Sequence, residues 1–541
     1  MEEYIELNNF EYSLITSKNL IFFLPLLYNS RYFGLLLPYN NFYIKTIEKI
    51  ENQNFKNNEI KNILLKDYNI LKIIYKNDDF EQYKLLNSKL VYNTNKEGYI
   101  NVYFDIRNLY DTEEFNRIYN IEKYKNFIII KFNKDNINYQ IKISKFKSYE
   151  ENQDKWIKIY YNYDEYRRSP PYYRYVYSPI KFYGDRIEII FNEDSNISGN
   201  SKFTINKLIK KRIESFINNN NISAGFPWYF QEWTRDTLIS LYGIYKINKD
   251  IVKHKLIEYS NYFLMDGRLK NIKDSNVGNS DGIGLYIKRL FDFKDLFSNE
   301  EFNKIINIVE EKLISYENNY LDQKYFLFKA YPNESWMDTL NRQYPIEIQF
   351  LMMNSYDNLY NYTKKDEYKD KLDKLVKSVK YNYINDASLY DDIKNKKIRP
   401  NIFLSYYFYP KFLSNPEWER LFDYSLNHLL LYWGGLSSIS KFDKEFIGNS
   451  NEDNYYKNEG KSMHNGDSWI FINNISALSL CKVNKEKYNS IINKILKSNL
   501  EFIYMIGTLP ERASANNMKI AGALHQLWSL ATYIELKDVV A

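Results

Sequence analysis

Apolar residues follow two different periodicities along this chain, and the change near Thr204 constrains the fold more than any other feature. Up to about residue 195 the apolar runs are short, β-branched and separated by polar turns, which is typical of strands. After Thr204 apolar residues recur at helical spacing through long amphipathic segments. At 541 residues, the chain also exceeds the size at which a single core stops growing. We therefore predict a β-rich domain over 1–195 and a helical domain over 196–541.

Within these two domains, individual elements can be placed. The clearest strand patterns are 127–132, 139–143 and 187–191. The clearest helical patterns are 302–315, 347–362, 369–381, 418–431 and 488–502. Successive helix pairs over some 340 residues predict an all-α toroid, or α/α barrel, and the lack of a tight repeat argues against a solenoid. The Asn-, Asp-, Ser- and Gly-rich stretch 192–202 is the predicted linker.

Charge and composition exclude several classes of function. The net charge of +6 is spread along the chain without a run of Lys and Arg, which argues against a nucleic-acid partner. Cys481 is the single cysteine and only four histidines are present, so we expect neither a disulfide nor a His/Cys metal site. No stretch approaches 18 uninterrupted apolar residues, and 1–10 is acidic rather than basic. These features predict a cytoplasmic protein with no membrane partner.

The stretch 224–236 is the most unusual in the helical domain. It holds five aromatic residues and the pair Arg235–Asp236 within thirteen residues, directly before an apolar helical segment. Aromatic faces can cover the C–H face of a pyranose, and charged groups can bind its hydroxyls. A buried aromatic cluster at a helix N-terminus is the alternative reading.

Other connectors between the predicted helices carry a carboxylate, Arg, His or amide beside a Trp or a Gly/Pro turn. In a helical toroid the loops at one end converge on the axis, so unusual loops indicate a site. These connectors are 279–282, 334–338, 345–349, 398–401, 463–469, 507–511 and 525–529.

The order and the sequences of these loops resemble those of the amylo-α-1,6-glucosidase domain of glycogen debranching enzymes. The family pattern runs A-G-Y-P-W-F-x-x-W-G-R-D, T-W-M-D, P-V-E-I, I-R-P-N, H-x-G-T/D-x-W, E-L and Q-A-W-S. This chain has a counterpart of each element in order from 224 to 529, although Arg512 follows Glu511 where an apolar residue is common. The stretches 11–15 and 29–36 also resemble the β-sandwich domain of that family. The resemblance implies an N-terminal β-sandwich followed by an (α/α)6 barrel.

Glycoside hydrolysis needs two carboxyl groups, and in inverting enzymes they lie about 6.5–9.5 Å apart with a water between them. By resemblance, Asp338 is the acid and Glu511 the base. The apolar neighbours Trp336 and Met337 predict a raised pKa for Asp338, which would keep it protonated. Glu347 follows Pro345 in the first turn of a helix, where the backbone dipole favours the ionised form, so we assign it to hydroxyl binding.

The remaining candidates are expected to bind substrate or to support the two carboxyl groups. Arg235 and Asp236 would grip the terminal glucose, unless they form an internal pair that caps the helix. Gln526 and Trp528 would brace Glu511 without touching substrate. The other predicted substrate-binding residues are Trp228 and Trp233, for which core packing is the alternative, and Asp281, Trp336, Glu347, Arg399, Asn401, His464, Asp467 and Trp469.

The resemblance implies an inverting hydrolase for α-1,6-linked glucose stubs on glycogen or another branched α-glucan, with no cofactor. Another inverting α-glucosidase of the glucoamylase or trehalase type is the first alternative. A non-catalytic glycan-binding protein is the second, because Thr234 and Gly282 stand where the family has Gly and Ala. The sequence does not indicate the oligomeric state.

Overall fold

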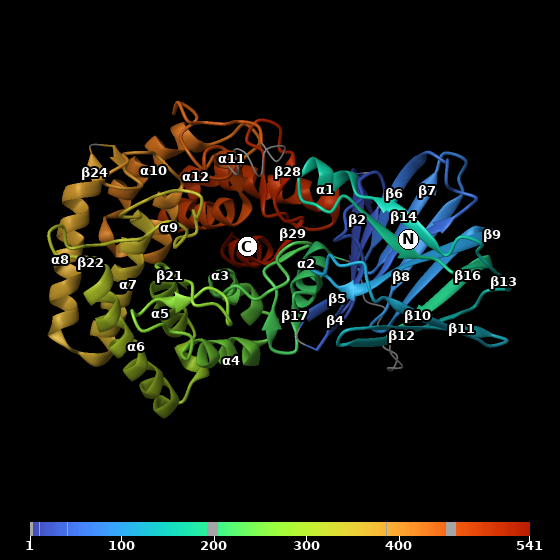
Figure 1. Ribbon diagram of the computed structural model, residues 1–541. Helices are drawn as coiled ribbons and strands as arrows, with labels where there is room; N and C mark the ends of the chain where they lie inside the picture. The colour runs from blue at the N-terminus through green and yellow to red at the C-terminus, as the bar shows by residue number, and fades with distance from the viewer. Residues whose placement is uncertain are drawn as a thin grey trace. The chain divides into compact units, whose positions relative to one another are not determined.

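The chain folds as two compact units in a computed structural model that describes residues 4–9, 11–40, 42–191, 204–385, 387–450 and 461–540 (Figure 1). The first unit comprises Met1–Asn221 with Glu501–Thr508, and the second comprises Ile222–Leu500 with Leu509–Ala541. The predicted linker, 192–202, and the predicted boundary at 195 lie outside the described residues.

The first unit is a β-sandwich whose layers share the long strands β9 and β16. One layer has the order β1-β6-β7-β8-β9-β16-β12-β11-β10. In the other layer β2, β3, β4 and β5 pair in sequence, and both β5 and β15 pair with β9. The first part of β9 pairs with β8 and its last part with β5, so this strand passes from one layer to the other. The elements are β1 (Ile5–Leu7), β2 (Tyr12–Thr16), β3 (Ile21–Pro25), β4 (Gly34–Tyr39), β5 (Phe42–Asn52), β6 (Ile60–Lys66), β7 (Ile70–Tyr75), β8 (Phe80–Leu85), β9 (Lys89–Asn108), β10 (Ile118–Lys123), β11 (Phe127–Lys134), β12 (Ile137–Ser144), β13 (Ser148–Glu151), β14 (Trp156–Tyr160), α1 (Asn162–Tyr166), β15 (Tyr173–Tyr177), β16 (Ile180–Ile190) and α2 (Ile205–Glu214).

Alternating burial explains why these segments form strands. In β12 the buried positions Tyr139, Ile141 and Ile143 alternate with more exposed polar ones, as expected where one face of a sheet covers the core. The strands predicted at 127–132, 139–143 and 187–191 correspond to β11, β12 and the end of β16. The predicted β-sandwich is thereby confirmed.

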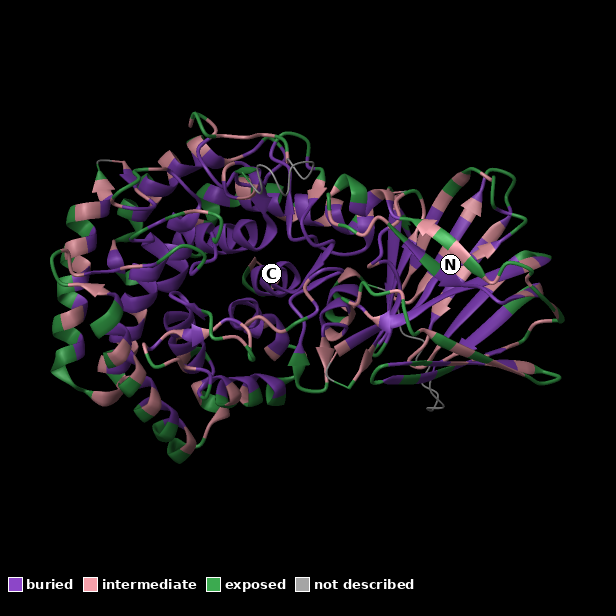
Figure 2. Cartoon of the chain, viewed as in Figure 1, coloured by how far each residue is buried: buried purple, intermediate pink, exposed green. Residues whose placement is uncertain are grey.

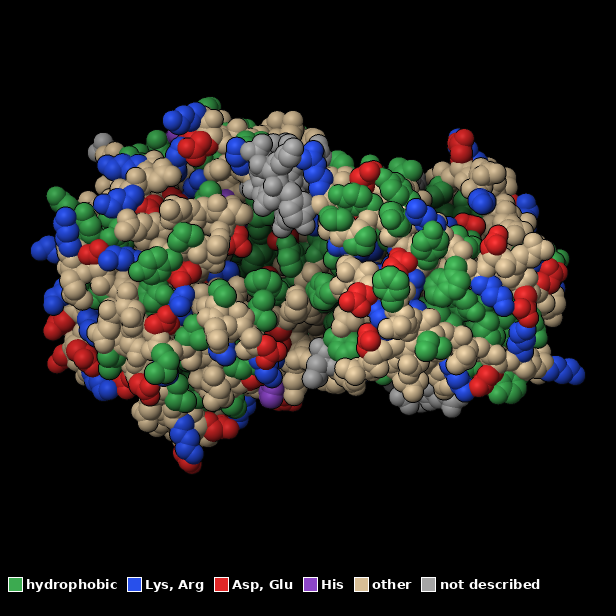
Figure 3. All heavy atoms as spheres, viewed as in Figure 1, with side chains coloured by type: hydrophobic (Ala, Val, Ile, Leu, Met, Phe, Trp, Pro, Cys, Tyr) green, Lys and Arg blue, Asp and Glu red, His purple; other side chains and the backbone are tan. Residues whose placement is uncertain are grey.

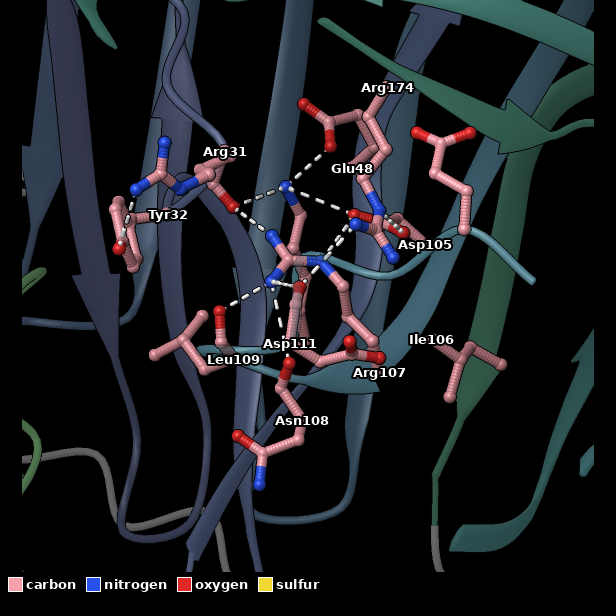
Figure 4. A network of polar contacts seen from close by, with 12 residues as sticks. Arg31, Tyr32, Glu48, Asp105, Ile106, Arg107, Asn108, Leu109, Asp111 and Arg174 are labelled. Carbon is pink, nitrogen blue, oxygen red and sulfur yellow. Dashed lines mark hydrogen bonds and ion pairs between the residues drawn. The ribbon is translucent and has the colours of Figure 1, made fainter. Parts of the chain in front are cut away.

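A buried network of charges lies inside the sandwich (Figure 4). The carboxylate of Asp105 accepts hydrogen bonds from Nε of Arg107 at 2.7 Å and from Nε of Arg174 at 2.9 Å. Lys45 pairs with Glu48 beside them. Burial alone would raise the pKa of Asp105, but Arg107, Arg174 and Lys45 hold it well below its usual value. Asp105 is therefore ionised and paired, as a buried charge must be. Burial instead lowers the pKa of Lys45 and raises that of Glu48.

Helices dominate the second unit. Short two-stranded pairings, such as β20–β21, β22–β23 and β24–β25, lie between them. The elements are α3 (Thr234–Tyr245), α4 (Lys249–Tyr259), β20 (Leu269–Lys270), β21 (Gly278–Asn279), α5 (Gly282–Asp292), α6 (Asn299–Tyr320), β22 (Leu321–Asp322), β23 (Leu327–Phe328), α7 (Ile346–Thr363), α8 (Asp366–Tyr383), β24 (Ile384–Asn385), β25 (Ser388–Leu389), α9 (Asn401–Phe408), α10 (Asn415–Leu429), α11 (Lys461–His464), β26 (Ser468–Trp469), α12 (Ile470–Ile506), β27 (Arg512–Ala513), β28 (Ile520–Ala521), β29 (His525–Gln526) and α13 (Leu527–Val540). The five predicted helical segments fall on α6, α7, α8, α10 and α12, although α10 ends two residues before the predicted 431.

Six inner helices close a ring within the described part of this unit. The helix α3 packs on α5, α5 on α7 and α7 on α9, and α13 packs back on α3. The first part of α12 completes the ring: Ser479 bonds the carbonyl of Phe403 in α9 at 3.0 Å, and Asn474 bonds the carbonyl of Ser529 in α13 at 3.0 Å. Non-helical backbone at Asn484 ends this part of α12. The closed ring confirms the predicted α/α barrel.

Burial separates the inner helices from the outer ones (Figure 2). The inner helix α9 is buried at all eight positions. The outer helix α8 is buried only at Tyr368, Leu372, Leu375, Val379 and Tyr383, which form one stripe. A helix apolar on all sides must lie inside, and an amphipathic one must lie at the surface. The two sequence patterns therefore determine which helices line the barrel.

The order of helices explains why the predicted site residues meet. The chain alternates between outer and inner helices, so every connection from an outer helix to the next inner one ends at the same mouth of the ring. The connectors singled out in the sequence precede the inner helices α3, α5, α7, α9, α12 and α13.

Candidate active site

A pocket of about 560 Å³ opens at this mouth. Asp338 reaches it from the connector before α7, Glu511 from the connector before α13, and Asp236 from the first turn of α3. The predicted residues that line it are Trp233, Arg235, Asp236, Trp336, Asp338, Trp469, Glu511, Gln526 and Trp528. The structure thus brings three carboxyl groups, from distant parts of the sequence, around one space.

Asp338 lies beside a buried histidine. Its carboxyl group is 53% exposed, and its Oδ1 lies 3.4 Å from Nε2 of His464, whose side chain is fully buried. Burial lowers the pKa of His464 to about 4, although Asp338 opposes the shift. The imidazole is therefore neutral near pH 7, and we place its proton on Nε2, where it is donated to the carboxylate. His464 contacts the predicted acid and does not line the pocket.

The expectation of a raised pKa at Asp338 is wrong. Burial alone would raise the pKa of Asp338, but the hydrogen bond from His464 and the charge of Arg235 lower it below its usual value. The neighbours Trp336 and Met337 are indeed buried, yet the carboxyl group itself projects into the pocket. Burial therefore acts on this side chain in the expected direction, but the hydrogen bond from His464 and the charge of Arg235 outweigh it.

Glu511 is held in a tight backbone clamp. The amide of Ala523 donates to its Oε2 at 2.8 Å, and the amide of Glu511 donates to the carbonyl of Ala523 at 2.8 Å. Gly522 directly precedes Ala523 in the chain and has a φ of +70°. A Cβ atom at Gly522 would lie 2.2 Å from Oε2 of Glu511, so the position of this carboxylate depends on a glycine there.

Asp236 carries a proton near neutral pH. Burial raises its pKa to about 8, and the charges of Glu511 and Asp338 add to this against the opposing charge of Arg235. Its Oδ1 accepts a hydrogen bond from Nε2 of Gln526 at 3.1 Å. Gln526 was expected to brace Glu511; the structure shows it bonded to Asp236.

Arg235 binds residues other than Asp236, so the alternative of an internal Arg235–Asp236 pair is not what the structure shows. Its Nε donates to Asp281 at 2.8 Å, and its Nη2 donates to the side chain of Asn279 at 2.8 Å and to the carbonyl of Glu334 at 2.9 Å. Asp281 is only 3% exposed, and burial raises its pKa against the effect of Arg235. Arg235 therefore ties three connectors together at the wall, and Asp281 is its buried counterion.

Aromatic rings form one side of the pocket. Trp336 meets Trp469 edge to face at 5.6 Å between ring centroids, and Trp469 meets Trp528 at 5.8 Å. His464 stacks on Trp469 at 5.0 Å from behind. The buried indole N–H groups of Trp233 and Trp528, which also line the pocket, have no partner within the described part of the chain. Rings with free donors are suited to a hydroxylated ligand.

Several predicted substrate contacts lie behind this wall and hold it. Asn401 accepts the indole N–H of Trp336 at 2.9 Å and donates to Asp391 at 2.6 Å. Arg399 binds the carbonyl groups of Ser438 and His464. All of these side chains are buried.

Glu347 and Asp467 likewise bind arginines. Glu347 lies in the first turn of α7, as predicted, but it is 1% exposed and binds Arg342, whose Nη1 lies 3.0 Å from its Oε2. Asp467 pairs with Arg512 and accepts from Ser450 at 2.6 Å. Glu347 was predicted to bind a substrate hydroxyl, but in the structure it binds Arg342 behind the pocket wall.

Sequence reasoning missed Arg342 and Asp391, which join several of these residues. Nη1 of Arg342 donates to both Glu347 and Asp391 at 3.0 Å, and both partners are buried. Arg342 lies in the connector before α7, between the two motifs that hold Asp338 and Glu347. Sequence reasoning also missed Tyr229, Asn333, Thr339 and Met463 in the lining. Tyr229 belongs to the 224–236 motif and Met463 begins the connector 463–469, so the sequence could have suggested both, whereas Asn333 and Thr339 only flank the connector 334–338.

Trp228 and the substituted motif positions lie away from the lining. Trp228 is buried, at 9% exposure. Thr234 is 1% exposed and donates its hydroxyl to the carbonyl of Lys270 at 2.7 Å. At Gly282 a Cβ atom would lie 2.8 Å from Cβ of Leu269. The two substitutions therefore follow local packing, and neither residue touches the pocket.

Two broader properties bear on the site. Among the residues that the structure describes, no helix is both long and apolar enough to cross a membrane. Nor do the described ranges contain a group of three or more His, Cys, Asp or Glu side chains placed to hold a metal ion.

The barrel, the carboxylate-lined pocket and its aromatic wall define a glycoside hydrolase. Residues 203–535, more than half of the chain, match the family model described as amylo-alpha-1,6-glucosidase, and the chain belongs to this family. The family assignment confirms the resemblance described in the sequence analysis.

Solved structures give weaker matches. A wild-type glycosidase is 12% identical, covering 62% of this chain and 96% of its own, with a TM-score of 0.46. A GH63 mannosylglycerate hydrolase from Thermus thermophilus, in complex with Tris and D-glycerate, is 11% identical, covering 62% and 99%, with a TM-score of 0.47. An uncharacterized conserved protein from the same organism is 12% identical, covering 61% and 99%, with a TM-score of 0.47. No curated protein sequence matches the chain.

Proposed function

We propose that this protein hydrolyses the α-1,6 bond of single glucose stubs on glycogen or another branched α-glucan, with inversion at the anomeric carbon. The proposal rests on the family and on one observation: Asp338 and Glu511, which the resemblance makes the acid and base, line the same pocket. No step of this reaction requires a cofactor.

In this mechanism the two carboxyl groups act on opposite sides of the scissile bond. Glu511 takes a proton from a water molecule as that water attacks the anomeric carbon. Asp338 gives its proton to the glycosidic oxygen, and the bond between this oxygen and the anomeric carbon breaks. The products are glucose with inverted configuration and the debranched chain.

Substrate binding must supply the protonation state that this mechanism requires. Asp338 has a lowered pKa in the free pocket, but its carboxyl group is half exposed. A sugar bound against it excludes water, and the loss of solvation favours the neutral acid. His464 then holds the group in place without taking its proton, because burial lowers the pKa of the ring to about 4 and makes it a weak base.

The other pocket residues fit a sugar ligand. Protonated Asp236 can donate a hydrogen bond to a glucose hydroxyl, since its pKa is raised to about 8. The indole N–H groups of Trp233 and Trp528 are two further donors, and the face of Trp469 can lie against the pyranose. An amphipathic ligand of this kind would satisfy donors that the protein leaves unpaired.

Glucose release from limit dextrin tests the activity. We expect the wild-type protein to release glucose whose first-formed anomer, followed by NMR, is β. Asp338→Asn and Glu511→Gln should each lower kcat by about 10³-fold or more, because each removes a group that transfers a proton in the transition state. Full activity of either variant would refute its role, and an α-anomer as first product would refute inversion.

The raised pKa of Asp236 makes it a second candidate for the acid, and a leaving-group test separates the two. α-Glucosyl fluoride needs little protonation on leaving, so a variant that lacks only the acid should still cleave it. We expect Asp338→Asn to retain activity on the fluoride while losing activity on limit dextrin, and Asp236→Asn to lose both. The reverse pattern would assign the acid to Asp236.

A comparison of substrates tests which glucosidic linkage the enzyme prefers. We expect the highest kcat/KM on α-1,6-linked stubs, with slower cleavage of maltose-type and trehalose substrates. A preference for maltose-type or trehalose substrates would instead favour an α-glucosidase of the glucoamylase or trehalase type.

A further inference from the structure

The outward face of one hairpin in the β-sandwich has an unusual composition. The strands β14 and β15 pair with Trp156 opposite Tyr177, Lys158 opposite Tyr175, and Tyr160 opposite Tyr173. The side chains between these positions point inward. In β15 they are Arg174 and Val176, and both are buried. A sheet with one solvated face normally places polar side chains outward. Here the outward row is almost entirely aromatic.

These outward rings are open to solvent. Trp156 is 40% exposed, Tyr160 51%, Tyr173 49% and Tyr175 42%. In Figure 3 hydrophobic side chains gather on the face of the β-sandwich where Figure 1 places β14. Chain-wide enrichment in tyrosine does not account for this row, because the outward side chains of β12 (Asn138, Gln140, Lys142) are polar. We call the four exposed rings of β14 and β15 the aromatic face.

Trp156, one of the four rings of the aromatic face, is packed from below and from one side. Trp156 lies 5.0 Å from the ring of Tyr177 and 5.7 Å from that of Tyr119. The guanidinium of Arg117 covers Trp156 at 4.7 Å and also donates to the carbonyl of Tyr175 at 2.7 Å. Rings fixed before a ligand arrives lose little conformational entropy on binding.

The chemistry of the face favours an uncharged carbohydrate. The outward row offers ring faces and phenolic hydroxyls, contains one ammonium group from Lys158, and includes neither an aliphatic side chain nor a carboxylate. Lys158 itself lies over the ring of Tyr173 at 3.9 Å. Ring faces cover the C–H surface of a sugar while hydroxyls bond its edge. Four residues along a strand span about 13 Å, so the row can extend along a chain of several sugars.

We propose that the aromatic face binds an α-glucan chain of the substrate polymer, as a site separate from the pocket in the helical unit. The identity of this ligand rests on the proposed function, since the family points to a glucan that presents many chains on one particle. A second point of attachment raises the apparent affinity for such a polymer, although the chemistry at the first site does not change. A substrate that is too short to occupy both sites at once gains nothing from the second.

The test compares a polymer with a short substrate. In Trp156→Ala/Tyr173→Ala, which removes one ring from each strand, we expect the Kd for glycogen to rise by about tenfold, because each lost ring contact is worth about a few-fold or more in affinity. The kcat/KM for a short branched oligosaccharide should stay within about twofold of wild type. The control Tyr381→Ala/Tyr432→Ala removes two rings that are 87% and 68% exposed elsewhere, and it should change neither value.

Two further measurements make the result unambiguous. Tyr173→Phe/Tyr175→Phe keeps the ring faces and should retain most of the affinity, and thermal unfolding will verify that each variant is folded. Unchanged glycogen binding by the folded Trp156→Ala/Tyr173→Ala variant would overturn the proposal. A change of that variant from dimer to monomer, with glycogen binding unaltered, would also overturn it and assign the face to a second copy of the chain.

The outcome is distinguishable from failure of the proposed function. If wild-type protein cleaves limit dextrin but the aromatic variant binds glycogen normally, the hydrolase stands and the aromatic face does not bind the polymer. If wild-type protein binds glycogen through these rings but releases no glucose, the second site stands and the proposed hydrolysis fails.

Discussion

Replacement of Gly522 by alanine tests the role of Glu511 without changing any carboxyl group. In the folded chain a Cβ atom at position 522 would lie 2.2 Å from Oε2 of Glu511. Because the carboxylate is the end of a flexible side chain, it must retreat by about 1 Å to reach van der Waals distance. That movement also disrupts the hydrogen bond from the amide of Ala523.

The expected loss follows from this displacement. Misplacement of a reacting group by about 1 Å costs on the order of 10²-fold in rate. We therefore expect Gly522→Ala to lower kcat on limit dextrin by about 10²-fold with a smaller effect on KM. The left-handed backbone at this position, with φ of +70°, should also cost about 1–2 kcal/mol of stability when occupied by alanine.

A matched control distinguishes two causes of a lower kcat: backbone strain at the substituted glycine and displacement of the Glu511 carboxylate. Gly507 has nearly the same backbone angle, with φ of +71°, and a Cβ atom there would meet Leu65 at 2.7 Å, a contact within the first unit. We expect Gly507→Ala to lose stability of the same order in urea unfolding while kcat stays unchanged. Wild-type kcat in a folded Gly522→Ala protein would refute the reasoning, and equal losses of kcat in both variants would attribute the effect to strain.

Three further predictions test the electrostatics. His464→Phe keeps the stack on Trp469 but removes the hydrogen bond that lowers the pKa of Asp338. The alkaline limb of the pH profile of kcat/KM should therefore move to higher pH. An unchanged alkaline limb would contradict the role of Asp338 as the acid. Asp236 has a raised pKa of about 8, so it stays protonated in the folded state while the unfolded chain ionises, and stability should fall as pH rises from about 4 to 8. Asp236→Asn should remove this fall and be more stable than wild type near pH 8 by about 1–4 kcal/mol in urea unfolding, whereas parallel pH profiles would contradict the shift. Asp105→Asn leaves buried cations unpaired in the β-sandwich and should cost about 3–5 kcal/mol in the same assay; a loss below about 1 kcal/mol would show that the network contributes little.

The architecture could be predicted from the sequence because it depends on local periodicity. Alternating apolar residues in β11 and β12, and the single buried stripe of α8, each specify an element and the face that it buries. The sequence order of outer and inner helices then places the connectors at one mouth.

The contacts within the site could not be predicted in the same way because they join distant residues. Arg235 stands next to Asp236 in the sequence, but its nitrogen atoms reach Asp281, 46 positions further on. The raised pKa predicted for Asp338 is wrong because His464 and Arg235, both distant in the sequence, lower this pKa by more than burial raises it. Sequence adjacency is therefore a poor guide to ion pairing inside a barrel.

Membership in a family motif does not make a residue a substrate contact. Asn401 binds the indole of Trp336, and Arg399 binds the carbonyl of His464, so both belong to motifs because they position other motif residues. Trp336 forms part of the pocket wall, and His464 contacts Asp338. Loss of either supporting side chain would leave Asp338 and Glu511 in the sequence but would alter the pocket wall or the contact between His464 and Asp338. The proposed catalysis would therefore depend on a buried polar scaffold as much as on the side chains that line the pocket.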